Sequence, residues 1–231
     1  MIRRPASPDG DRWRRPGDVA AAYAHEPWST RAHTVVRWAT SPMGVLEREL
    51  PERGSVLEIG CGHGLFCLVA ALGSADRHVV GADIDAAKIV EARRAARSAH
   101  LDEDRVRFLE VAPDWRPPAE PRYDAVVIID VLYLLGIPAA LELTAAAARA
   151  VAPGGRLLVK EVDTDLRWKA RLSATQEFVS TRLTRITEGE TNVSVPLDRL
   201  RATMEAEGLN VSSRALDRGY LWPHALLTGT R

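Results

Sequence analysis

The chain has 231 residues, and its 31 lysine and arginine residues balance 31 aspartate and glutamate residues. This length predicts one full α/β domain and leaves no room for two ordinary domains with a linker. The zero net charge argues against a nucleic-acid or anionic-membrane partner, and no stretch approaches the roughly 20 apolar residues of a membrane span. We therefore expect a soluble, cytoplasmic protein with a small or neutral partner.

The N-terminal part divides into a tail and a helical region. Residues 1–17 are rich in arginine, proline, aspartate and glycine without an apolar period, which predicts a flexible tail. The single domain then spans residues 18–231. Between residues 18 and 50, apolar residues recur at helical spacing, with Pro42 interrupting the run and Pro51 ending it. This pattern predicts two or three leading helices.

After these helices, short β-branched runs alternate with longer runs rich in alanine, arginine and leucine. This alternation predicts a parallel sheet covered by helices. The expected strands are residues 55–59, 78–82, 106–110, 125–129 and 156–161. The expected helices are residues 65–72, 86–99 and 138–151, and Pro153-Gly154-Gly155 is expected to form the tight turn before the fifth strand.

The C-terminal part departs from this alternation. Residues 165–195 form an insertion with helical character at 165–187, which is a candidate substrate lid. The next helix is expected at residues 196–207, and Gly208 ends it. The last two extended runs, 209–216 and 224–230, are joined by a link too short for a parallel crossover. We expect them to form an antiparallel hairpin at one edge of the sheet.

The most informative stretch is VLEIGCGHG, residues 56–64, in which a buried-type strand runs into three glycines and then a helix. Glycines let the backbone approach a ligand closely, and the following helix offers free N–H groups. The pattern predicts an adenine-bearing cofactor. A nicotinamide or flavin fingerprint needs glycine or alanine where Leu65 stands. Asp83 ends the second strand, where a carboxylate can accept both ribose hydroxyls.

Together these motifs resemble the class I S-adenosylmethionine-dependent methyltransferases of the small-molecule type. In that family the first strand ends in acidic-x-Gly-x-Gly-x-Gly and the second ends in an acidic residue, here Glu58, Gly60, Gly62, Gly64 and Asp83. YDAVVIIDVLYLL, residues 123–135, is similar to the fourth strand and its loop, and APGGRLLVKE to the fifth strand. The resemblance covers about residues 50–231 and implies a Rossmann-like, doubly wound α/β sheet of seven strands.

The resemblance also implies a cofactor site for S-adenosyl-L-methionine, with S-adenosyl-L-homocysteine as the product. The glycine loop would hold the methionine end, and Asp83 would hold the ribose. In the place where the family often has an acidic adenine ligand, this chain has Ala112, so backbone groups or Asp114 would substitute. The implied cofactor-binding residues are Glu58, Gly60, Cys61, Gly62, Gly64, Asp83, Ile84, Val111, Ala112, Asp130 and Val131.

Three residues are candidates for acceptor chemistry. Tyr133 follows the fourth strand, where it either contacts the acceptor or packs against the next helix. Glu161 ends the fifth strand and, with Asp163, either deprotonates the acceptor or is a solvated or ion-paired carboxylate. His224 opens the last strand and is either a general base or structural. His63 in the glycine loop either contacts a ligand or faces solvent.

In small-molecule members of the family, leading helices often fold over the cofactor. Four ring-bearing residues of residues 18–50 would then shield the site, or would simply pack between helices: Tyr23, His25, Trp28 and His33. Methyl transfer is a direct displacement that depends on positioning. The two cysteines, Cys61 and Cys67, predict neither a disulfide nor a zinc site, so no metal is expected.

Two other functions stay open beside a methyltransferase acting on a secondary metabolite or a lipid-like compound. One is a nicotinamide-dependent Rossmann oxidoreductase, which the glycine spacing opposes. The other is a protein that binds S-adenosylmethionine without catalysis. The first would bind nicotinamide and not S-adenosylmethionine, and the second would methylate no acceptor.

Overall fold

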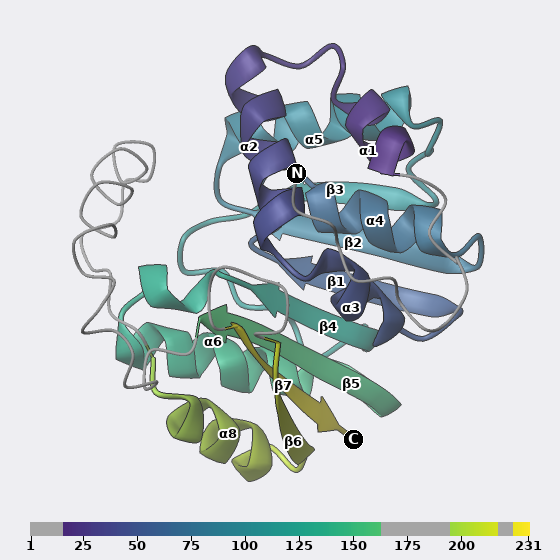
Figure 1. The fold of residues 1–231 in the computed structure, drawn as a ribbon. Coiled ribbons are helices and arrows are strands. Elements are labelled where there is room, and N and C mark those ends of the chain that lie inside the picture. Colours follow the sequence, from purple (N-terminus) through teal and green to yellow (C-terminus); the bar gives the residue numbers. More distant parts are fainter. Residues whose placement is uncertain (1–15, 163–194, 217–223) are drawn as a thin grey trace, which may run out of the picture.

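The computed structural model describes residues 16–162, 195–216 and 224–231. Its centre is a seven-stranded sheet in the order β3-β2-β1-β4-β5-β7-β6 (Figure 1). Neighbouring strands from β3 across to β5 pair in parallel, whereas β7 runs antiparallel to both β5 and β6. The strands are β1 (Gly54–Ile59), β2 (Arg77–Asp83), β3 (Val106–Glu110), β4 (Tyr123–Ile129), β5 (Val151–Val162), β6 (Asn210–Ala215) and β7 (His224–Thr230).

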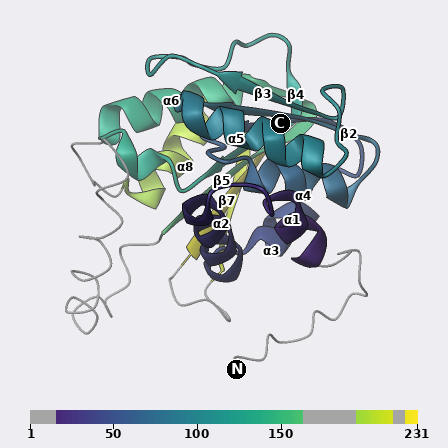
Figure 2. The same ribbon diagram turned by 90° about the horizontal axis from the view of Figure 1, so that it is seen from above.

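Helices cover both faces of the sheet. On one face, α1, α3, α4 and α5 share a buried cluster with the sheet, and α6 and α8 pack on the other face. Figure 2 shows α1, α2 and α3 grouped beside α4. The helices are α1 (Pro16–Ala22), α2 (Trp28–Thr40), α3 (Met43–Arg48), α4 (Leu65–Gly73), α5 (Ala86–Ser98), α6 (Ile137–Arg149) and α8 (Leu197–Ala206), with a 3-10 turn η1 (Leu132–Leu134) after β4.

The central strands are buried on both faces, which explains their continuous apolar sequence. In β1, Val56 belongs to the cluster under α4, and Leu57 belongs to the cluster under α6. Such strands lack the alternation of a half-exposed strand. The carboxyl ends of β1, β2, β4 and β5 meet at one edge of the sheet, where open α/β sheets place their ligands.

The expected architecture is confirmed, including the seven strands and the terminal antiparallel hairpin. The main difference lies at β5, which begins at Val151 and not at residue 156. Tyr123 pairs with Val151, and the next pair is Ala125 with Arg156, across an irregularity. The Pro153-Gly154-Gly155 turn therefore interrupts β5 instead of preceding it, and α6 ends two residues before the strand begins.

Three leading helices are present, which agrees with the expected two or three. The first of them begins at Pro16, so the last two residues of the expected tail, residues 16 and 17, are helical. The rest of that tail lies outside the described residues. The candidate lid at residues 165–187 and the candidate carboxylate Asp163 also lie outside them.

Candidate active site

The glycine loop follows β1 and turns sharply into α4. Gly60, Gly62 and Gly64 have φ values of +74°, +55° and +76°, in the left-handed region that disfavours other residues. A Cβ on Gly60 would lie 2.3 Å from Val131 Cγ2, and one on Gly64 would lie 2.7 Å from the Phe108 ring. At Gly62, by contrast, nothing lies within 4 Å of the Cβ position. The loop is tightly packed on two sides and open at Gly62.

Asp83 lies at the end of β2 and is bound to this loop. Its Oδ2 accepts a hydrogen bond from the Gly62 amide at 2.7 Å, and its Oδ1 accepts one from the Asp85 amide at 2.9 Å. A carboxylate offers about four lone-pair positions, so each oxygen retains capacity for another donor. The geometry therefore leaves Asp83 able to accept two hydroxyl groups beside the open side of the loop.

The residues expected around an adenine ring lie next to Asp83. Ile84 is 59% exposed and offers an apolar surface outside the core. The Val111 amide donates to the Asp83 carbonyl at 3.0 Å, so the end of β3 lies against the end of β2. Val111 is half-buried and Ala112 is exposed. Asp114, the acidic residue expected as a possible substitute, is exposed.

Glu58 lies near the end of β1, just before the glycine loop. It is buried, and its Oε2 accepts a hydrogen bond from Cys67 Sγ at 2.9 Å. Burial raises the pKa of Glu58 to about 8, so the carboxyl is protonated at neutral pH. Cys61 and Cys67 are free, buried thiols. Glu58 thus connects β1 to α4 on either side of the glycine loop, and its contact with a cofactor stays a prediction.

The end of β4 carries a buried ion pair. Asp130 has a φ of +54°, which is uncommon for a residue with a side chain. Lys160 Nζ lies 2.6 and 2.7 Å from its two carboxylate oxygens, and Arg37 Nη1 lies 3.2 Å from Oδ2. Burial alone would raise the pKa of Asp130, but the charges of Lys160 and Arg37 outweigh it and lower that pKa. Asp130 is therefore an ionised carboxylate.

Glu161 holds the loop that follows β4. It is buried, and its Oε1 accepts hydrogen bonds from the amides of Val131 and Leu132 at 3.3 and 3.0 Å. Burial, reinforced by the charge of Asp130, raises the pKa of Glu161 to about 7. Its Oε2 makes no hydrogen bond that involves another described residue. Glu161 is thus both a support for the loop and a carboxyl that titrates near neutral pH.

His224 is the first residue of β7. It pairs with Val162, the last residue of β5. Its ring Nε2 is 3.0 Å from the Thr40 carbonyl oxygen. Because a carbonyl only accepts, that nitrogen carries the proton, and Nδ1 carries the lone pair. Burial, helped by the charge of Lys160, lowers the pKa of His224 to about 4. The imidazole is therefore neutral at physiological pH.

Tyr133 lies in η1, the 3-10 turn that follows β4. It is half-buried, and burial together with the charge of Asp130 raises the pKa of its phenol. The phenol therefore stays protonated and can donate a hydrogen bond. Asp130 and Arg37 act electrostatically on both Tyr133 and His224, and Glu161 acts on Tyr133, so the three residues expected to serve the acceptor lie in one region.

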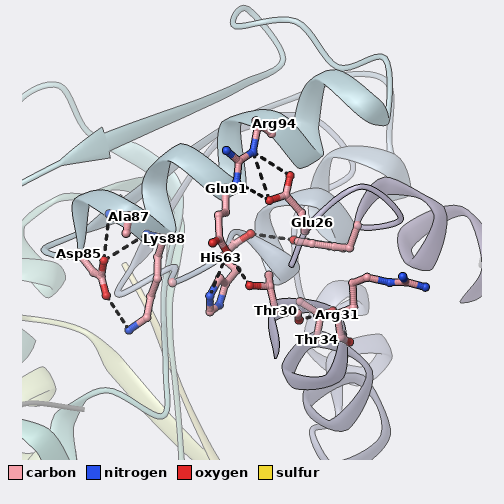
Figure 3. A network of polar contacts seen from close by, with 12 residues as sticks. Glu26, Thr30, Arg31, Thr34, His63, Asp85, Ala87, Lys88, Glu91 and Arg94 are labelled. Atoms are coloured by element: carbon pink, nitrogen blue, oxygen red, sulfur yellow. Dashed lines mark hydrogen bonds and ion pairs between the residues drawn. The ribbon is translucent and has the colours of Figure 1, made fainter. Parts of the chain in front are cut away.

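The leading helices cover the glycine loop through polar contacts (Figure 3). Tyr23 donates to the His63 carbonyl at 2.8 Å, and Thr30 donates to Glu91 of α5 at 2.7 Å. Glu91 in turn lies 3.4 Å from the His63 ring nitrogen Nε2. Tyr23 is buried in the core cluster and also contacts the loop, so its packing role is observed and its shielding role stays a prediction. Trp28, by contrast, is 82% exposed.

The histidines of this region make one further contact. The His33 and His63 ring centroids lie 5.0 Å apart, and burial lowers the pKa of both. His25 is exposed.

In the part of the chain that the structure describes, no group of three or more His, Cys, Asp or Glu residues could hold a metal ion. Within the same residues, no helix is long and apolar enough to cross a membrane.

Sequence reasoning missed Arg37 and Lys160. A lysine inside the apolar strand RLLVKE is a usable signal, because a buried ammonium requires a counter-ion. Arg37 has no such signal, since it reaches Asp130 across 93 positions of sequence.

Comparison with known proteins identifies the family. Residues 32–214 match the family described as a methyltransferase domain. The ribosomal protein L11 methyltransferase of Nitrosomonas europaea is 33% identical over 158 residues, which cover 65% of this chain and 48% of that protein. The chain therefore spans about half the length of this curated relative.

Solved structures share the fold. An O-methyltransferase family protein from Burkholderia thailandensis superposes with a TM-score of 0.66 at 26% identity, over 90% of this chain and 61% of that one. The magnesium protoporphyrin IX methyltransferase of Synechocystis PCC 6803, with bound S-adenosylhomocysteine, gives a TM-score of 0.59 at 18% identity, over 93% and 86%. The chain therefore belongs to the methyltransferase domain family and has the class I fold of S-adenosylmethionine-dependent methyltransferases.

Proposed function

We propose that this protein transfers a methyl group from S-adenosylmethionine to a small-molecule acceptor. The observation that carries the proposal is the arrangement at the ends of β1 and β2. Asp83 is fixed by the Gly62 amide at 2.7 Å while keeping free lone pairs, and the space beside Gly62 is open. A ribose bound there would place its two hydroxyls on the Asp83 carboxylate.

The remaining cofactor contacts follow from this placement. Ile84 would pack on the adenine ring, and the backbone of Val111 and Ala112 would meet its amine. The methionine end would lie between the glycine loop and the Asp130-Val131 segment. The relative from Synechocystis with bound S-adenosylhomocysteine supports this choice of cofactor.

The acceptor side would use the residues at the ends of β4, β5 and β7. The sulfonium of S-adenosylmethionine supplies the methyl group, and the protein must hold the acceptor in line with it and exclude water. Glu161, with a pKa of about 7, is suited to take a proton at neutral pH through Oε2. Tyr133 would orient the acceptor by a hydrogen bond, and neutral His224 would hold α2 through Thr40.

These groups favour a hydroxyl-bearing acceptor, since a hydroxyl must lose a proton and a neutral amine need not. The similar O-methyltransferase family protein supports the same choice. The relative that is named for ribosomal protein L11 favours a second candidate, a protein acceptor. We place the protein in the cytoplasm, a choice supported by the two free thiols of Cys61 and Cys67.

The first experiment addresses the cofactor. Calorimetric titration with S-adenosylmethionine should show binding, and mass spectrometry of the purified protein should detect S-adenosylhomocysteine. Asp83→Ala should weaken binding by about 1–3 kcal/mol, because it removes a charged hydrogen-bond acceptor. Unchanged affinity in this variant would contradict the ribose placement.

The second experiment addresses the acceptor. Methyl-labelled S-adenosylmethionine is incubated with the enzyme and either a small-molecule or a protein fraction of a cell extract. Label that appears in the small-molecule fraction supports the proposal. Label confined to protein supports the second candidate, and no label in either fraction, from a protein that binds the cofactor, indicates a non-catalytic binder.

A further inference from the structure

The helix α2 turns its polar residues toward the protein. Thr30 and Thr34 are buried, and Thr30 donates to Glu91 of α5 (Figure 3). Arg37, about two turns further along, reaches Asp130 at the end of β4. The inner side of this helix is thus held by hydrogen bonds and an ion pair, and Trp38 is its one partly buried large apolar residue that packs against the described core cluster. A surface helix usually packs against the rest of its protein through an apolar stripe.

The opposite side of α2 is apolar and exposed. We call it the outer face of α2, and it consists of Trp28, Ala32, Val35, Val36 and Ala39. Residues 28, 32, 35 and 39 follow the spacing i, i+4, i+7 and i+11, so they form one stripe along the helix. Trp28 is 82% exposed, Val35 59% and Val36 56%.

This exposure is concentrated and not scattered. Of the exposed large hydrophobic residues in the described part of the chain, three lie on α2, and the other three are spread over α4, α5 and the end of β2. Single exposed apolar residues are normal, but a contiguous stripe marks a surface that another body covers. The outer face of α2 is therefore an interaction surface.

The charges around this face favour an anionic partner. The helix contains no aspartate or glutamate, and Arg31 is exposed on it. Nearby carboxylates are engaged within the protein: Glu26 pairs with Arg94, Glu47 pairs with Arg77, and Glu91 accepts a hydrogen bond from Thr30 on the inner side of α2. None of these three carboxylates belongs to the outer face of α2.

The sequence ahead of α1 is rich in arginine. Residues 1–15 contain five arginines against two aspartates, and this segment ends where α1, which contacts α2, begins. The zero net charge of the whole chain conceals this local excess of positive charge.

We propose that the outer face of α2 docks on an anionic lipid surface. Its apolar side chains would enter the boundary between headgroups and acyl chains, where tryptophan is favoured, while Arg31 and the N-terminal arginines attract lipid phosphates. A second copy of this chain fits less well, because pairing two such faces would bring like charges together. The inference rests on α2 and on the arginine-rich sequence ahead of α1, and it holds whichever acceptor the enzyme uses.

Docking of this kind has a consequence for the candidate site. The same helix carries Arg37, which contacts Asp130 at the edge of the sheet where the acceptor is expected. A lipid surface on the outer face of α2 therefore lies one helix away from the candidate acceptor region.

The test is vesicle flotation with the full chain. Vesicles of phosphatidylcholine mixed with phosphatidylglycerol should bind the protein, and phosphatidylcholine alone should bind it more weakly, with added salt reducing the difference. The double variant Val35→Glu/Val36→Glu should lose about tenfold or more in binding. Leu72→Glu is the matched control, because Leu72 is 42% exposed but lies at the far end of α4.

Circular dichroism establishes that each variant is folded, and Trp28→Ser provides a second test of the same face should the double variant fail to fold. The proposal is overturned when the wild-type chain does not float with mixed vesicles, or when the variants of the outer face float as well as the wild type. It is also overturned by sedimentation velocity that shows a dimer which these variants dissociate, since a second copy would then cover the face.

Discussion

The two halves of the candidate site are built in different ways. The cofactor half, at the ends of β1 and β2, is made of backbone turns and a carboxylate within a short stretch of sequence, from Gly60 to Asp83. The acceptor half, at the ends of β4, β5 and β7, joins residues that lie far apart, such as Arg37 with Asp130 and Thr40 with His224. A local motif can fix the first half, whereas only the complete fold assembles the second.

The electrostatic character of the halves differs in the same way. In the cofactor half, Glu58 is buried against Cys67 and kept protonated by burial, so its side chain adds no charge. In the acceptor half, a buried lysine neutralises an ionised aspartate, and Arg37 adds a further positive charge. The acceptor half thus depends on compensation between buried charges, whereas the cofactor half combines the shape of the glycine loop with the single carboxylate of Asp83.

The largest expected effect concerns this compensation. Lys160→Met removes the buried counter-ion of Asp130 and should lower the free energy of unfolding by about 3–5 kcal/mol, because it leaves a buried charge with only Arg37 beside it. Urea unfolding measures the change. Adding Asp130→Asn to this variant should restore part of the loss, since asparagine tolerates a positive φ and carries no charge. A double variant as unstable as the single one would contradict this account.

The next effect concerns the proposed base. Glu161→Gln keeps an oxygen for the amides of Val131 and Leu132 but cannot accept a proton, so the methyl-transfer rate should fall about a hundredfold. The affinity for S-adenosylmethionine should stay unchanged. Single-turnover rates and calorimetry separate these quantities. An unchanged rate would remove Glu161 from the chemistry and leave it as a support for the loop.

The glycine loop offers a matched pair of variants. Gly60→Ala should cost about 2–3 kcal/mol of stability, since its Cβ would lie 2.3 Å from Val131 in a strained backbone conformation. Gly62→Ala has space around its Cβ and should cost only about 1 kcal/mol, while weakening cofactor binding because it fills the open side of the loop. Thermal unfolding and calorimetry provide the two readouts. Equal losses of stability would show that steric contact with Val131 does not matter.

The difference between the halves also explains what the sequence reveals. The strands, the glycine loop and Asp83 are predictable because each rests on local patterns: continuous apolar runs, glycines at fixed spacing and an acidic residue at a strand end. The sequence places the start of β5 too late, at residue 156. Val151, which pairs with Tyr123, comes before the Pro153-Gly154-Gly155 turn, and such a turn usually marks a strand boundary.

The acceptor half is predictable only as a region. Its residues lie at strand ends, which the sequence indicates, but their partners do not follow from it. The hydrogen bond between His224 and Thr40 spans 184 positions, and its direction fixes which ring nitrogen carries the proton. Likewise, the role of Glu161 in holding the Val131-Leu132 backbone depends on how β4 and β5 align.

The last expected effect is the response of stability to pH, which has opposite signs for Glu58 in the cofactor half and His224 in the acceptor half. Between pH 4.5 and about 8 the unfolded chain loses the Glu58 proton while the folded protein keeps it, so stability falls as pH rises, by about 1.4 kcal/mol per unit. Between pH 6.5 and about 4 the unfolded chain protonates His224 while the folded protein does not, so stability falls as pH decreases.

Two neutral variants separate these contributions. Glu58→Gln should flatten the alkaline side of the stability profile, and His224→Gln should flatten the acidic side, because each removes the group whose protonation differs between the folded and unfolded states. Urea unfolding across this pH range measures both. Should Glu58→Gln leave the alkaline slope unchanged, Glu161, whose pKa of about 7 gives the same sign, would carry the response, and the acceptor half would then dominate both sides of the profile.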